Sequence, residues 1–297
     1  MPGDMLSSGG AVLARALRRM SGRDSMLYVG GVSFFALLAL FPGLTLLVTL
    51  YSLIAPPGRA AAEAAAFATV LPPAAQALVH DEVAKILRAP VRSLGLQGAF
   101  SLLVGAYASH RGVKALLAGL QFIYAERRPR SMFEFNMLAL VVGIAAFLII
   151  TVASSGFLAF RLAVSTLHLA PLKQTWLFNA WTWAGGGLTL GLTLLYRYAM
   201  ASHPVSIRAA GLSGALAALL TLGASWLSAL YVTHVVNLGA AYGSIGAVVV
   251  FLIWLSWNVN AVLFGAALTT EIEIALGEGA ASDLPDAEPQ TVVGRLH

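Results

Sequence analysis

The stretch that decides the fold runs from Ser93 to Arg130 and reads SLGLQGAFSLLVGAYASHRGVKALLAGLQFIYAERRPR. Its apolar residues extend far enough to cross a bilayer, yet His110, Arg111 and Lys114 lie near its middle. As one helix, residues 94–125 would be roughly 48 Å long at 1.5 Å per residue, more than the hydrocarbon core of about 30 Å. Two placements are therefore open. Either the basic cluster lies inside the membrane, or the second half of the stretch is an amphipathic helix on the cytoplasmic surface.

The composition of the whole chain indicates a membrane protein. Hydrophobic residues make up 59% of the 297 residues and charged residues 10%, with a mean hydropathy of +0.82. Soluble domains carry about 25% charged residues, so this chain lacks the residues for a water-facing surface of that kind. The absence of cysteine excludes disulfides, thiolate metal ligands and a cysteine nucleophile. The net charge of +5 does not predict nucleic-acid binding, because most basic residues cluster beside hydrophobic segments.

The hydrophobic segments predict an all-α, polytopic membrane protein with six transmembrane helices in one domain, residues 26–275. The expected spans are residues 27–55, 94–125, 133–160, 176–196, 209–231 and 245–269. Residues 56–93 form a loop with short helical pieces, residues 1–25 a basic segment, and residues 276–297 an acidic, disordered tail. Leu13, Leu17 and Met20 fall at helical spacing, so the basic segment is either an interfacial helix or a frayed tail.

Basic residues in the connections predict the orientation. They are Arg15, Arg18, Arg19 and Arg23 before span 1, Arg127, Arg128 and Arg130 between spans 2 and 3, and Arg197 and Arg208 between spans 4 and 5. The connection between spans 3 and 4 has only Arg161 and Lys173, and that between spans 5 and 6 has no basic residue. The positive-inside rule therefore places both termini in the cytoplasm and the loop 56–93 in the periplasm.

Glycines in the spans predict close helix packing. Gly187 and Gly191 in span 4, and Gly214 and Ala218 in span 5, have small-xxx-small spacing, which lets helix backbones approach closely in lipid. No polar turn surrounds these glycines, so we do not interpret them as a phosphate-binding loop.

The acidic residues do not support catalysis. We expect all 13 Asp and Glu residues to lie in tails, loops or span ends, Glu271 and Glu273 included. The six histidines are scattered, and no Gly-x-Ser-x-Gly, His-Glu-x-x-His or Walker pattern occurs. We therefore expect no enzyme activity, no metal ion and no cofactor. Proton relays and cation sites in membranes use buried Asp or Glu, so spans without them also disfavour a cation carrier.

The candidate ligand-binding residues are basic and polar side chains of spans 2 and 6: His110, Arg111, Lys114, Gln121, Asn258 and Asn260. On a helix, those of span 2 fall roughly on one face. A charge at the bilayer centre costs about 3 kcal/mol or more, so it needs a partner such as a phosphate- or carboxylate-bearing ligand. At the membrane surface the same basic residues would contact anionic lipid headgroups. The two asparagines are equally compatible with hydrogen bonds between helices.

Four segments carry a resemblance to a known family. They are residues 109–116 (SHRGVKAL), 121–128 (QFIYAERR), 194–197 (LLYR) and 241–247 (AYGSIGA). In these segments the chain resembles the YihY/BrkB family of inner-membrane proteins, formerly labelled ribonuclease BN. The family-motif positions are Tyr196, Arg197, Tyr242, Gly243, Ser244 and Gly246. The family usually continues its last span with Gly-Ala-Glu, whereas Gly265 and Ala266 here precede Ala267.

The resemblance implies a bacterial inner-membrane protein with six spans and no settled activity. Our leading hypothesis is transport or translocation of an anionic solute or lipid, because span 2 is rich in cations and poor in acids. The expected partners are the lipid bilayer, its anionic headgroups and an anionic small molecule, but not nucleic acid. The alternative is a non-transporting scaffold of the cell envelope, and a ribonuclease is the least favoured function. The sequence leaves the oligomeric state open.

Overall fold

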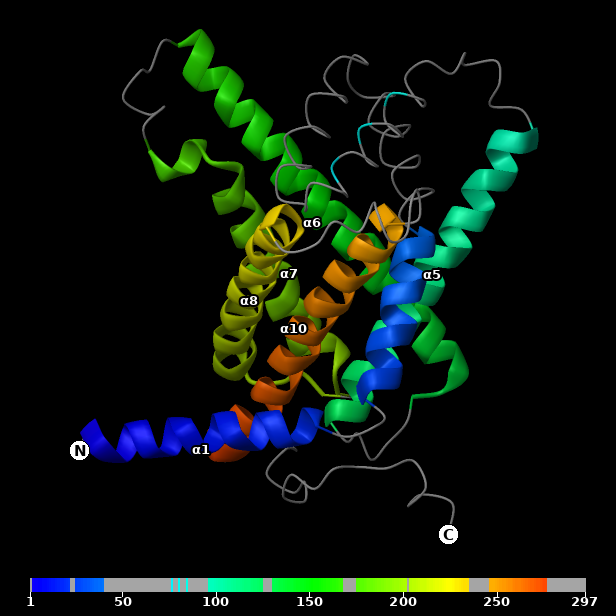
Figure 1. The fold of residues 1–297 in the computed structure, drawn as a ribbon. Helices are drawn as coiled ribbons and strands as arrows, with labels where there is room; N and C mark the ends of the chain where they lie inside the picture. Colours follow the sequence, from blue (N-terminus) through cyan, green and yellow to red (C-terminus); the bar gives the residue numbers. More distant parts are fainter. Residues whose placement is uncertain are drawn as a thin grey trace.

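The computed structural model is helical over most of the residues that it describes, which are 2–21, 25–39, 76, 80, 84, 96–124, 130–167, 175–201, 203–234 and 246–276. Its elements are α1 (Pro2–Met20), an unlabelled helix Ser25–Ala39, α5 (Leu96–Tyr124), α6 (Met132–Thr166), the 3₁₀ turn η3 (Trp176–Phe178), α7 (Ala180–Ala199), α8 (Ile207–His234) and α10 (Gly246–Leu276) (Figure 1). There is no strand among the described residues. The all-α prediction is confirmed for them.

Three of the described helices are long and apolar enough to cross a membrane: Met132–Arg161, Ile207–Ser228 and Val248–Leu276. They coincide with the predicted spans 133–160, 209–231 and 245–269. Helices α5 and α7 form where spans 2 and 4 are predicted, and the helix Ser25–Ala39 covers the first part of span 1. Residues 40–55, the tail from residue 277 and nearly all of the loop 56–93 lie outside the described residues. The six-span topology therefore stays a prediction.

Helix α5 is continuous through the basic cluster, from Leu96 to Tyr124. It packs against the helix Ser25–Ala39 in the opposite direction. A Cβ built on Gly112 would lie 3.6 Å from the Cβ of Phe35, and one on Gly119 would lie 3.3 Å from the Cβ of Tyr28. The two helices therefore contact each other closely at positions where α5 has no side chain.

The predicted packing glycines Gly187 and Gly191 of α7 and Gly214 of α8 lie at helix contacts. A Cβ built on Gly187 would lie 3.3 Å from the Cβ of Ala153 in α6, and one on Gly214 would lie 2.9 Å from the backbone nitrogen of Thr193 in α7. Gly191 lies beside Ile149, farther along the same antiparallel pair. Van der Waals contact between backbones is a main source of helix association in lipid, and these positions supply it.

One end of the bundle collects the polar helix termini, and we call it the polar end. Five helix termini meet there: the ends of α5, α7 and α10, and the starts of α6 and α8. Side chains of α1 and of the helix ends join them by hydrogen bonds. Helix α1 crosses this end at a steep angle to the long helices, with the N-terminus projecting to one side (Figure 1). A helix, not a frayed tail, therefore forms over the basic N-terminal segment.

Tyr196 and Gly265 meet in the core, where α7, α8 and α10 approach one another. Tyr196 is fully buried in α7, and its hydroxyl donates a hydrogen bond of 2.7 Å to the carbonyl of Val262 in α10. A Cβ built on Gly265 would overlap this hydroxyl and would lie 2.7 Å from the Cβ of Ala217 in α8. Glycine at position 265 therefore allows α7, α8 and α10 to meet.

We predict that Gly265→Ala destabilises the protein by about 1–3 kcal/mol, because the added methyl group overpacks this contact and displaces the Tyr196 hydroxyl. Thermal melting of the purified chain in detergent, followed by tryptophan fluorescence, measures the effect. Gly223→Ala is the matched control, since a Cβ there meets no atom within 4 Å. Equal melting temperatures for the two variants would contradict the packing described.

Candidate functional site

Arg111, the first of the predicted ligand-binding residues, lies exposed on α5 between two aromatic rings. Its guanidinium carbon is 5.4 Å from the ring centroid of Phe35 and 5.9 Å from that of Tyr107. Among the described residues, no carboxylate lies within ion-pair distance of it. Cation–π contacts are worth about 0.5–2 kcal/mol each and leave the positive charge in place. Arg111 therefore retains the capacity to pair with an anion.

Lys114 lies one turn farther along α5 but extends in another direction. Its ammonium donates a hydrogen bond of 2.7 Å to Oδ1 of Asn136 in α6 and lies 5.8 Å from the ring centroid of Phe135. The preceding residue, Val113, packs beside Gly143, seven residues after Asn136, or about 10 Å along α6. The Lys114 side chain therefore reaches toward the polar end, as long basic side chains do when they snorkel out of hydrocarbon.

The other predicted residues do not converge on one point with these two. His110 is half-buried on α5, and Gln121, also half-buried, has its Nε2 buried without a hydrogen-bond partner among the described residues. Asn258 and Asn260 both donate to carbonyls of their own helix, those of Trp254 and Ser256. The structure thus places the six candidates without joining them into a single site, and their role in binding stays a prediction.

The family-motif residues that are described have structural contacts. Tyr196 joins α7 to α10, as shown above. The Arg197 guanidinium donates to the carbonyl of Val205 at 3.1 Å, and the Val205 N–H donates back to the Arg197 carbonyl at 2.9 Å, which closes the turn between α7 and α8. Gly246 begins α10 and is buried. Tyr242, Gly243 and Ser244 lie outside the described residues.

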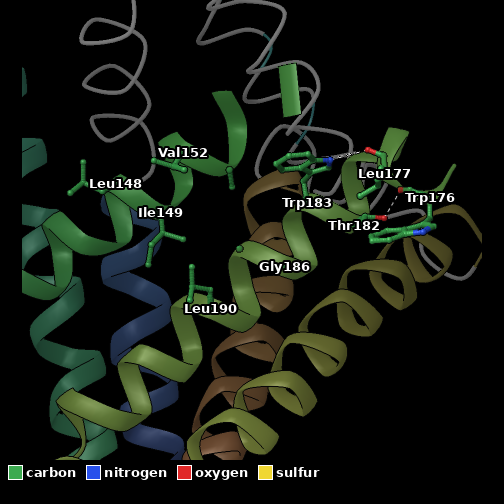
Figure 2. A pocket seen from close by; sticks show the side chains of 11 residues that line it. Leu148, Ile149, Val152, Trp176, Leu177, Thr182, Trp183, Gly186 and Leu190 are labelled. Atoms are coloured by element: carbon green, nitrogen blue, oxygen red, sulfur yellow. Dashed lines mark hydrogen bonds between the residues drawn. The ribbon is translucent and has the colours of Figure 1, made fainter. Parts of the chain in front are cut away.

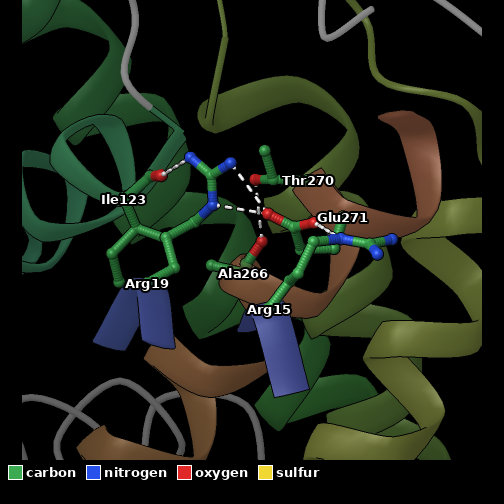
Figure 3. Close-up of polar contacts among 6 residues, drawn as sticks. All are labelled: Arg15, Arg19, Ile123, Ala266, Thr270 and Glu271. Atoms are coloured by element: carbon green, nitrogen blue, oxygen red, sulfur yellow. Dashed lines mark hydrogen bonds and ion pairs between the residues drawn. The ribbon is translucent and has the colours of Figure 1, made fainter. Parts of the chain in front are cut away.

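The carboxylate of Glu271 is buried at the polar end, which the sequence did not predict. Helix α10 continues to Leu276, past the predicted end of span 6 at residue 269, and Glu271 inside it is 1% exposed. Arg15 Nε lies 2.7 Å from Glu271 Oε2, and Arg19 Nε lies 2.9 Å from Oε1 (Figure 3). Each carboxylate oxygen therefore pairs with one arginine of α1.

Arg19 links three helices. Its Nη2 is 2.8 Å from Glu271 Oε1, at an angle unsuited to a hydrogen bond, so that contact is ionic only. Its Nη1 donates to the carbonyl of Ile123 at the end of α5, at 3.4 Å. A carboxylate near the C-terminus of a helix is unfavourable for the helix dipole, and the two arginines offset this cost. The site holds two positive charges against one negative charge.

A second buried carboxylate, Glu273, joins another three helices. It is 1% exposed, Tyr124 of α5 donates to its Oε2 at 3.0 Å, and the backbone N–H of Ser206 donates to its Oε1 at 3.1 Å. Because Ser206 directly precedes α8, the carboxylate satisfies a free N–H at a helix N-terminus, where negative charge is favoured. Glu273 therefore ties α10 to α5 and to the start of α8.

Two signals in the sequence point to this arrangement in retrospect. Arg15 and Arg19 are four residues apart and share the buried face of α1 with Ala16. Glu271 and Glu273 are the last acids before the acidic tail, and the apolar periodicity of span 6 continues past them. Among the described residues, no three His, Asp or Glu side chains gather closely enough to hold a metal ion.

We predict that Glu271→Gln costs about 3–5 kcal/mol of stability, because it leaves two arginines at a buried site without their counter-charge. It should also expose α1 to trypsin, with faster cleavage after Arg15 and Arg19. Thermal melting and timed proteolysis in detergent measure the two effects.

The matched control is Glu134→Gln, since Glu134 is exposed and contributes only a capping box at the start of α6. Its loss should cost no more than about 1 kcal/mol and leave α1 protected. If α1 is cleaved at the same rate in wild type and in Glu271→Gln, the ion pair does not hold this helix.

Comparison with known proteins identifies the family. The sequence model of the family described as "Virulence factor BrkB" matches residues 16–291, nearly the whole chain. No curated protein and no solved structure gave a match. The resemblance stated above is thereby confirmed, and with the three helices apolar enough to span a bilayer it identifies a membrane protein. The chain belongs to the virulence factor BrkB (YihY) family.

Proposed function

We propose that this protein crosses the bacterial inner membrane six times, with both termini in the cytoplasm, and translocates an anionic solute or lipid past Arg111. The alternating directions of the described helices support this topology, and so does the collection of basic residues at the polar end. In this orientation the polar end faces the cytoplasm. The proposal assigns binding and passage to the chain, and no reaction.

The observation that carries the proposal is the position of Arg111 along α5. The polar end is fixed at Ile123, whose carbonyl accepts from Arg19. Arg111 precedes Ile123 by twelve residues, or about 18 Å along the helix, which is more than half of a hydrocarbon core of about 30 Å. An arginine at this depth costs about 3 kcal/mol or more without an anionic partner. Binding of an anion at Arg111 would recover this energy.

The two basic residues of α5 have different roles in this proposal. Lys114 reaches back toward the polar end, where Asn136 accepts from its ammonium, so its placement needs no ligand. Arg111 instead contacts Phe35 and Tyr107, and Tyr107 lies one turn farther from the polar end. We therefore assign binding of the anion to Arg111. Lys114 is a secondary positive charge near the path that the anion would take.

We predict that Arg111→Ala slows translocation at least tenfold, that Arg111→Lys retains part of the rate, and that Lys114→Ala has a smaller effect. The measurement uses proteoliposomes in two arms. One follows dithionite quenching of a headgroup-labelled phosphatidylglycerol, and the other follows release of inorganic phosphate. The two arms distinguish a lipid from a solute.

Arg18→Ala is the control, because Arg18 is an exposed arginine of α1. It removes the same charge and should leave the rates unchanged. Wild-type rates equal to those of empty liposomes in both arms would refute translocation of these anions, and an unaltered rate in Arg111→Ala would exclude Arg111 from the mechanism.

A further inference from the structure

Arg111 lies on an outward-facing side of α5. Leu103, Tyr107 and Arg111 follow one another at intervals of four residues, so they lie along one side of the helix. Leu103 is 70% exposed, Tyr107 is 62% exposed, and Arg111 is exposed as well. Leu120 follows Arg111 by about two and a half turns, so it points in the opposite direction, and it is fully buried. Arg111 therefore faces away from the interior of the bundle.

The neighbouring helix Ser25–Ala39 continues this exposed surface. Its residues Phe34 and Leu38 are four positions apart, and both are exposed. The Phe34 ring contacts the Phe35 ring edge-on, with 5.4 Å between their centroids, and Phe35 in turn contacts the Arg111 guanidinium. Figure 1 shows this helix and α5 on the side of the bundle away from α8. We call the surface the lateral face, and its exposed residues are Phe34, Leu38, Leu103, Tyr107 and Arg111.

The lateral face combines one positive charge with an apolar surround. Of its five residues only Arg111 is charged, and neither α5 nor the helix Ser25–Ala39 contains an Asp or Glu. The rings of Phe35 and Tyr107 attract the guanidinium but do not neutralise it. The lateral face therefore presents an uncompensated cation to whatever surrounds the bundle.

A phospholipid fits this surface better than a water-soluble anion does. A water-filled passage to Arg111 would hydrate the large apolar side chains beside it, which is unfavourable. A phospholipid is already in the bilayer and reaches the lateral face sideways. Its phosphate pairs with the guanidinium, and its acyl chains cover the apolar residues. Because the two helices offer no carboxylate to an ammonium group, the surface favours a phospholipid with a net negative charge.

We propose that the anion bound at Arg111 is the phosphate of an anionic phospholipid that enters sideways from the bilayer across the lateral face. This inference rests on the proposed function, which places Arg111 inside the membrane. It adds the substrate class, a lipid and not a solute, and the direction from which that substrate reaches the site.

The groove between α6 and α7 provides an internal control. Its volume is about 490 Å³, and Figure 2 shows Leu148, Ile149 and Leu190 among the residues that line it. None of its lining residues is charged. Leu190 precedes the end of α7 at Ala199 by nine residues, or about 14 Å, so it lies no deeper from the polar end than Arg111. A lipid headgroup should therefore reach the lateral face and not this groove.

Photo-crosslinking of the full chain in lipid nanodiscs tests the proposal. The probe is phosphatidylglycerol with a diazirine on its headgroup, and mass spectrometry locates the labelled residues. We expect labelling at residues 34–38 and 107–111 to exceed labelling at Leu190 at least fivefold. Unlabelled phosphatidylglycerol should compete at least fivefold better than phosphatidylcholine, and inorganic phosphate should not compete. Labelling no stronger than at Leu190, equal competition by the two lipids, or competition by inorganic phosphate would overturn the proposal.

Charge variants test whether Arg111 holds the headgroup. Arg111→Gln should lower labelling of the lateral face at least fivefold, and Arg111→Lys should retain most of it because the positive charge remains. Arg18→Gln removes an equal charge from an exposed position of α1 and should leave the labelling unchanged. Undiminished labelling in Arg111→Gln would show that this charge does not bind the headgroup.

A single thiol tests the direction of entry while Arg111 is intact. The chain has no cysteine, so Leu38→Cys places one thiol on the lateral face. A charged methanethiosulfonate, which reacts from water, should modify it in nanodiscs at least tenfold more slowly than Ser21→Cys, at an exposed position next to α1. Equal rates would reveal a water-filled path and overturn lipid entry, while the proposed translocation of a solute would stand. Arg111-dependent labelling in a chain that translocates nothing would refute the proposed function and support lipid binding at Arg111.

Discussion

The buried carboxylate of Glu271, paired with Arg15 and Arg19, is the interaction on which the polar end depends. Removing a carboxylate from water costs several kcal/mol, and the fold recovers this only by bringing cations to it. The cations come from α1, which is separated from Glu271 by more than 250 residues of chain. The pair therefore fixes the first helix across the end of the last one. Through the contact of Arg19 with the Ile123 carbonyl, it also fixes the end of α5.

The polar end satisfies helix termini with side chains from other helices. Arg130 donates to the carbonyls of Ala199 and Ala201 at the end of α7, and Glu273 accepts from the N–H of Ser206 at the start of α8. Backbone groups that lack such partners are costly near a bilayer, so each helix end depends on its neighbours. Along the rest of their length the helices pack through buried aliphatic side chains and through close contacts at Gly187, Gly214 and Gly265. Hydrogen bonds and ion pairs thus set the register of the helices at one end of the bundle, and close helix packing maintains that register along the rest.

The sequence predicts the helices much better than it predicts the contacts between them. Long apolar segments specify α6, α8 and α10, because hydropathy and length suffice to identify a spanning helix. The burial of Glu271 could not be predicted from its own helix, because its partners lie at the other end of the chain. Lys114 and Arg111 differ for a similar reason. They are three residues apart, but one faces Asn136 of α6 and the other faces Phe35 of the preceding helix.

The basic residues of the bundle differ in what compensates their positive charge, and this difference distinguishes Arg111 from the others. Arg19 is neutralised by a carboxylate, and Lys114 extends its ammonium toward the polar end. Arg161 lies near the other end of α6, five residues before the helix ends at Thr166. Arg111 lies between the polar end and the other end of the bundle. It has ring faces on two sides, and no carboxylate lies within ion-pair distance among the described residues. Ring faces stabilise a cation without cancelling its charge. This lack of a carboxylate is the reason why the proposed function assigns the anion to Arg111.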